Sequence, residues 1–134
     1  MALALERGAQ RGVKLQVSGA FHTSLMQPAA AGMAVAVAAM QMRDPRVPII
    51  ANTTAEPITT AQGLRDELVK QLVQPVHWLR SMQYLRERGV DNVIEFGPGR
   101  VLTGLMKRID RSFAVRNVSD VASARVTSPT PAPP

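Results

Sequence analysis

The spacing of apolar residues changes along the chain. Some segments show the two-residue period of strands, and others show the three- to four-residue period of helices. Val13, Leu15 and Val17 alternate with polar residues, which predicts a strand with one buried face. Short apolar runs without this alternation predict strands that are buried on both faces. Strands are therefore predicted at 13–17, at 47–50 and at 93–96, and a last one at 113–118.

Helices are predicted where apolar residues recur every three or four positions. Leu64, Leu68 and Leu72 form one such face. Proline favours the first turn of a helix and glycine the position after its end, so Pro28 marks a start and Gly89 an end. The predicted helices cover residues 1–10, 28 to about 42, about 64–74, about 75–88 and 101–109.

Strands that alternate with helices in this way predict an α/β fold with a mostly parallel sheet. The chain has 134 residues and is 46% apolar, which suits one domain or part of a larger one. We assign residues 1–120 to this domain. Residues 121–134 include four prolines and have no apolar period, which predicts a disordered Pro-rich tail.

Composition excludes several classes of site. Cysteine is absent, which rules out disulfides and thiol catalysis, and with two histidines and no suitable acidic cluster we expect no metal site. A net charge of +6 indicates an acidic or nucleic-acid partner or an ordinary solvated face, and only 4% of residues are aromatic and available to stack on bases. A non-catalytic basic interaction module or nucleic-acid-binding module is therefore the alternative function.

Targeting segments are not expected from the pattern either. The first residues have no basic segment and reach Glu6 and Arg7 after a few apolar positions, unlike a secretory signal. The most apolar stretch, 25–42, is interrupted by Pro28 and Gly32, which does not suit a membrane span. We therefore expect a cytoplasmic location and no membrane contact.

His22 is the leading candidate for chemistry because it lies in a short loop after a predicted strand. Taken alone, such a histidine is compatible with a structural role. Its surroundings, VSGAFHTSLMQPA at 17–29, resemble the histidine motif of malonyl-CoA:acyl-carrier-protein transacylases and of related acyltransferase domains in polyketide and fatty-acid synthases. The resemblance covers roughly residues 5–118 and continues, in the family's order, through VPIIANTTAEPI, LVKQLVQPVHW and VIEFGPGRVLTGLMKRI.

The resemblance implies a ping-pong acyl transfer. In this family a serine takes the malonyl group from malonyl-CoA and passes it to the phosphopantetheine thiol of acyl carrier protein, in fatty-acid or polyketide biosynthesis. His22 matches the family's histidine, which acts first as base and then as acid. The implied partners are malonyl-CoA and acyl carrier protein, with no nucleic acid, and no cofactor is needed beyond the thioester substrate.

Gln71 matches the glutamine whose backbone carbonyl orients the family's histidine. The sequence supplies a physical reason, because a helical carbonyl at 71 would normally accept the amide hydrogen of residue 75, and residue 75 is proline. The carbonyl of Gln71 is therefore predicted to be free for His22. The alternative is an ordinary helix end satisfied by water.

Phe21 is the candidate substrate-binding residue. The Ala-Phe pair before the histidine resembles the malonyl-selective form of the motif, in which bulk would crowd a branched acyl group. The alternative is that Phe21 only anchors its loop.

The family's nucleophile lies in a Gly-His-Ser-x-Gly turn, and the chain contains no Gly-x-Ser-x-Gly. The serine and the N-terminal half of the enzyme are therefore expected outside this chain. The resemblance implies the C-terminal part of an α/β-hydrolase-like acyltransferase, with most of a small ferredoxin-like subdomain absent. We expect this fragment to be inactive alone.

Overall fold

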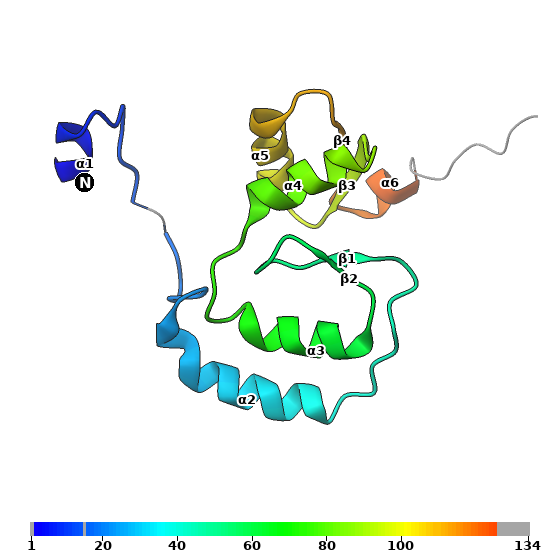
Figure 1. Ribbon diagram of the computed structural model, residues 1–134. Helices are drawn as coiled ribbons and strands as arrows, with labels where there is room; N and C mark the ends of the chain where they lie inside the picture. The colour runs from blue at the N-terminus through cyan, green and yellow to red at the C-terminus, as the bar shows by residue number, and fades with distance from the viewer. Residues whose placement is uncertain (1, 15, 126–134) are drawn as a thin grey trace, which may run out of the picture.

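The computed structural model describes residues 2–14 and 16–125 (Figure 1). Helices and short strands both occur through the described part of the chain. The elements are α1 (Ala2–Glu6), the 3-10 helix η1 (Ser24–Met26), α2 (Gln27–Ala38), β1 (Ile49–Ile50), β2 (Pro57–Ile58), α3 (Ala61–Lys70), α4 (Trp78–Glu87), β3 (Asn92–Phe96), α5 (Val101–Ile109), β4 (Ala114–Val118) and α6 (Val121–Arg125). No helix within 2–14 and 16–125 is long and apolar enough to cross a bilayer.

The first packing unit consists of two helices and a short hairpin. Helices α2 and α3 lie side by side, and the β1–β2 hairpin lies along α3 (Figure 1). The hairpin is antiparallel, with Ile49 opposite Ile58. Small side chains allow close packing here, since Ala30 and Ala51 are almost fully buried.

The second packing unit is a parallel β-α-β arrangement with a helix added. Strands β3 and β4 pair in parallel and α5 connects them, while α4 packs near α5 (Figure 1). The buried core of this unit is formed by Met82, Met106 and Phe113. Half-buried apolar residues surround this cluster: Trp78, Leu85, Val93, Ile109 and Val115.

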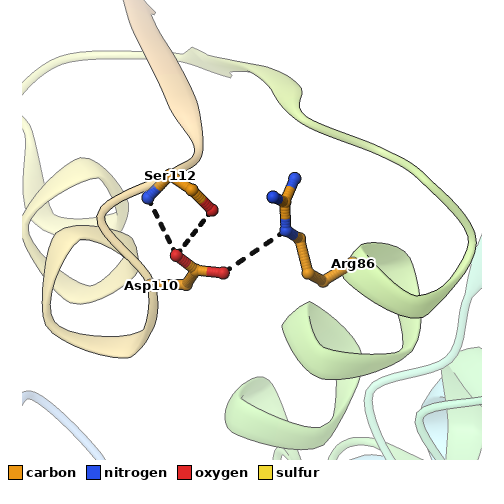
Figure 2. Close-up of polar contacts among 3 residues, drawn as sticks. All are labelled: Arg86, Asp110 and Ser112. Carbon is orange, nitrogen blue, oxygen red and sulfur yellow. Dashed lines mark hydrogen bonds and ion pairs between the residues drawn. The ribbon is translucent and has the colours of Figure 1, made fainter.

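Polar contacts tie α4 to the end of α5. Figure 2 shows Asp110 accepting hydrogen bonds from the amide and hydroxyl of Ser112, while Arg86 of α4 reaches its other oxygen at 3.4 Å. The guanidinium of Arg86 also lies 5.6 Å from the ring centre of Phe113. The bonds from Ser112, followed by the charge of Arg86, hold the pKa of Asp110 below its usual range.

Helix α5 is capped by a side chain from the preceding strand. The carboxylate of Glu95 in β3 accepts from the amides of Leu102 and Thr103, both at 3.0 Å, and from the Thr103 hydroxyl. These amides are among those at the start of a helix that have no partner within it. The hydrogen bond from the Thr103 side chain is the main cause that lowers the pKa of Glu95.

The predicted α/β composition is confirmed, but several details differ. The strand predicted at 13–17 is wrong for the described residues, because no neighbouring strand pairs with it and Val17 is 73% exposed. Helix α2 ends at Ala38, before the predicted Met42, and the pattern did not predict β2. Of the two sheets in the described part, one is antiparallel and one is parallel.

The predicted tail differs at its beginning. Residues 121–125 form α6, whose start is held by reciprocal bonds between Asp120 and Ser123. The remaining part of the predicted tail, 126–134, lies outside the described residues.

The lowered pKa of Glu95 predicts that stability declines in acid. A carboxylate that is bound only in the folded state contributes fully above its ordinary pKa of 4.5, and this contribution is lost as pH falls through the lower folded-state value. We expect the free energy of unfolding, measured by urea denaturation, to fall as pH drops below about 4.5, and Glu95→Gln to flatten that fall. Glu56→Gln, which removes an exposed loop carboxyl, is the control. A Glu95→Gln variant with the wild-type pH slope would contradict this role.

Candidate functional site

His22 lies in an exposed turn just before η1. Its backbone adopts a φ of 62°, a left-handed conformation that costs a non-glycine residue on the order of 1–3 kcal/mol. The same turn is closed by Thr23, whose hydroxyl donates to the carbonyl of Ala20 at 2.7 Å. A strained conformation of this kind persists only where surrounding contacts maintain it.

Two adjacent carbonyls at the end of α3 supply those contacts. The amide of His22 donates to the carbonyl of Leu72 at 2.9 Å, and Nδ1 of its ring lies 2.6 Å from the carbonyl oxygen of Gln71. A carbonyl can only accept, so the neutral ring must carry its hydrogen on Nδ1. Nε2 is then left with a lone pair, which is the arrangement a general base requires.

The Gln71 carbonyl is free because the helix cannot use it. Helix α3 ends at Lys70, and the carbonyl of Lys70 accepts from the amides of Val73 and Gln74. The carbonyl of Gln71 would next accept from residue 75, but Pro75 has no amide hydrogen. The contact expected between Gln71 and His22 is therefore present in the structure.

Asn52 is a further polar residue beside Gln71, and the sequence pattern did not single it out. Its Nδ2 donates to the side-chain Oε1 of Gln71 at 2.8 Å, and its carbonyl accepts from the amide of His77 at 2.8 Å. The signal that could have found it is its position in the loop that follows the predicted strand at 47–50, because loops after strands commonly carry functional side chains.

The loop that carries Asn52 is held by buried contacts. Thr53 is buried, and its amide and hydroxyl both donate to the carboxylate of Glu67 in α3, at 3.0 and 2.6 Å. The amide of Ala51 donates to the carbonyl of Glu56 at 2.9 Å, which closes the loop on itself. Hydrogen bonds therefore join this loop to the end of α3.

Phe21 lies next to His22 but is not deeply packed. Its side chain is 53% exposed, and its ring folds back over Gly19. A Cβ added at residue 19 would lie 2.9 Å from Cε2 of that ring. The ring therefore borders the His22 turn with one side open, where a neighbouring group could contact it.

The possible chemistry of this site is that of the His22 ring and its carbonyl partner. Within 2–14 and 16–125 no group of three or more His, Cys, Asp or Glu side chains could hold a metal ion. The arrangement of His22 and Gln71 can accept and return a proton through Nε2. It needs a nucleophile, and the nucleophile turn predicted from the resemblance does not occur in the chain.

Comparison with curated proteins finds malonyl CoA-acyl carrier protein transacylases among the relatives of this chain. The chain is 41% identical over 118 residues to the malonyl CoA-acyl carrier protein transacylase of Bacillus subtilis (strain 168), covering 88% of this chain and 37% of that protein. It is 44% identical over 102 residues to the protein of the same name from Escherichia coli (strain K12), covering 76% of this chain and 33% of that protein. No family model matches the chain.

Solved structures agree with this result. An acyl carrier protein S-malonyltransferase from Vibrio cholerae superimposes with a TM-score of 0.86 at 38% identity, covering 95% of this chain and 42% of that one. A malonyl-transacylase solved in complex with a type II PKS acyl-carrier protein gives a TM-score of 0.85 at 37% identity, covering 93% and 40%. The chain thus spans 33% to 42% of the length of these proteins.

Replacing Pro75 tests why the Gln71 carbonyl faces His22. In Pro75→Ala the new amide can donate to that carbonyl, so we expect the amide of residue 75 to be protected from hydrogen exchange and the contact with His22 to lengthen beyond hydrogen-bond distance. Exchange measured by NMR and a crystal structure of the variant would show both effects. Pro98→Ala, in the loop after β3, is the control. An unprotected amide beside an unchanged His22 contact would contradict the explanation.

Proposed function

Because the chain belongs to the malonyl CoA-acyl carrier protein transacylase family, we propose that it supplies the histidine of an acyl transfer from malonyl-CoA to acyl carrier protein. The observation that carries this proposal is the 2.6 Å contact between His22 Nδ1 and the carbonyl of Gln71. It leaves Nε2 as the basic atom on an exposed turn, where a serine from outside this chain can reach it.

The proposed reaction consists of two half-reactions. Nε2 of His22 takes the proton of the serine hydroxyl as its oxygen attacks the malonyl thioester, and the resulting imidazolium returns a proton to the departing coenzyme A thiolate. In the second half His22 takes the proton of the carrier's phosphopantetheine thiol as its sulfur attacks the malonyl-serine ester, and the imidazolium then protonates the serine oxygen. The Gln71 carbonyl stabilises the imidazolium in both halves because it faces Nδ1–H.

The complete enzyme in this proposal is an α/β-hydrolase-like acyltransferase with a mostly parallel sheet. Residues 1–120 are its C-terminal part, and the serine, the N-terminal half and most of a small ferredoxin-like subdomain belong to sequence outside this chain. Exposed apolar residues on β3 support this view, since Ile94 is 46% and Phe96 is 76% exposed. Both lie on the face of β3 opposite Val93, which packs against the core cluster, so they are available to further protein.

Acyl carrier protein is the proposed second substrate, in fatty-acid or polyketide biosynthesis. Carrier proteins are acidic, and the end of α5 presents Lys107, Arg108 and Arg111 as exposed basic side chains. A relative of this chain has been solved with its carrier protein bound, which supports the same kind of partner here.

Malonyl-transfer assays of His22 variants test the proposed role of this residue. For this chain alone, the rate of malonyl transfer from labelled malonyl-CoA to carrier protein should equal that of the no-enzyme control. The reason is that the chain lacks the serine of the Gly-His-Ser-x-Gly turn. Fusion to the serine-bearing part of the Bacillus subtilis relative should restore transfer. In that fusion we expect His22→Ala to lower kcat on the order of a hundred- to ten-thousand-fold, the range for a positioned acid-base group.

His77→Gln is the matched control in this assay, because only the main chain of His77 takes part in the contacts described above. Its activity should stay near that of the unmodified fusion. Transfer by the chain alone, or equal losses in the two variants, would contradict the proposed role of His22.

Phe21 is the proposed determinant of acyl selectivity. In the active fusion, Phe21→Ser should raise the ratio of the methylmalonyl to the malonyl kcat/KM about ten- to two-hundred-fold, the effect of fitting one methyl group into an apolar pocket. Competition between the two thioesters would measure this ratio, with the His77→Gln fusion as the control because only the main chain of His77 takes part in the contacts described above. A folded Phe21→Ser variant with an unchanged ratio would show that Phe21 only anchors the turn.

A further inference from the structure

We propose that Asn52 is a positioning residue for the histidine, acting through the side chain of Gln71. Its Nδ2 donates to Gln71 Oε1 at 2.8 Å, while the main-chain carbonyl of the same Gln71 faces His22 Nδ1 at 2.6 Å. Asn52 and His22 thus bind two ends of one residue. This inference rests on the proposed function, in which His22 acts as a base through Nε2.

The position of Gln71 explains why such support is needed. Gln71 follows the last helical residue of α3, and the next amides turn back to Val69 and Lys70 in a tight turn. Its carbonyl is in no helical bond, so the direction of that carbonyl depends on how the residue is held from other sides. Its side chain provides one such hold, and Asn52 is the partner of that side chain.

Asn52 is itself held through its main-chain carbonyl and through its neighbours in the loop. Its carbonyl accepts from the His77 amide at 2.8 Å, and the neighbouring Thr53 is bound twice to Glu67. Ala51 and Ala55 are almost fully buried on either side. Because Glu67 lies one helical turn before Gln71, the loop and α3 are joined at two successive points, and Asn52 makes the second of them.

The consequence is a defined tautomer at His22. With the carbonyl of Gln71 fixed toward Nδ1, the neutral ring keeps its hydrogen there and exposes Nε2 as acceptor. Without Asn52 the Gln71 side chain loses its partner, the carbonyl is less restricted, and the other tautomer gains population. Asn52 therefore influences the base without touching the ring.

The test reads the tautomer directly in the purified chain. The chain has only two histidines, so long-range proton–nitrogen NMR spectra at a pH where both rings are neutral resolve each, with His77 as internal reference. We expect His22 to be mainly in the Nδ1–H form. Asn52→Ala should lower its Nδ1–H to Nε2–H ratio about two- to tenfold, the fold-change that corresponds to one typical hydrogen bond.

Two control variants distinguish an effect of Asn52 on the His22 tautomer from a general loss of fold. In Asn52→Asp the Gln71 amide can turn and donate to the carboxylate, so the wild-type ratio should be retained. Asn117→Ala removes another amide, which donates to the carbonyl of Gly99 at 2.9 Å in the second packing unit, and should leave the ratio unchanged. Circular dichroism of each variant reports on its fold.

A double-mutant cycle tests the route through Gln71. If Asn52 acts through that side chain, Gln71→Ala and the double variant should show the same change as Asn52→Ala, with no further effect from combining them. Additive changes would overturn the proposal, as would a wild-type His22 mainly in the Nε2–H form or an unchanged ratio in Asn52→Ala. The readout uses no substrate, so a failure of malonyl transfer would leave it intact and would count against the proposed function alone.

Discussion

One missing amide hydrogen determines the geometry of this site. Pro75 cannot donate to the carbonyl four residues before it, and that carbonyl belongs to Gln71. An unpaired main-chain acceptor needs another donor, and Nδ1 of His22 lies 2.6 Å away. A helix end that would otherwise be ordinary therefore becomes a support that selects one tautomer of the ring.

The same segment joins the two packing units of the chain. The turn after α3 contacts His22 through two carbonyls, and the start of α4 contacts the loop after β1 through the amide of His77. The left-handed backbone of His22 is maintained by these contacts rather than by its own conformational preference. The site is thus built where the connecting segment contacts both the turn that carries His22 and the loop after β1.

Carboxylates bound to main-chain amides hold a loop in the first unit and the start of a helix in the second. Glu67 binds the loop after β1 through Thr53, and Glu95 binds the first turn of α5. In both cases a charged group from a regular element satisfies amides that would otherwise lack partners, which is a stronger contact than a neutral hydrogen bond. The apolar residues Ile94 and Phe96 of β3, in contrast, are left exposed in the described part of the chain, and the proposed complete enzyme would cover them.

The sequence by itself predicted α2 to α5 with approximate bounds, the strands at β1, β3 and β4, the family and the candidates His22 and Gln71, because helical period, proline chemistry and short motifs are local properties. The free Gln71 carbonyl was predictable for that reason, since it depends only on a proline four residues ahead. Only the tertiary structure revealed that Asn52 holds the Gln71 side chain and that residues 13–17 pair with no strand, because both depend on which distant segments meet. An alternating pattern indicates that a segment suits a sheet, but a strand forms only where a neighbour supplies the hydrogen bonds.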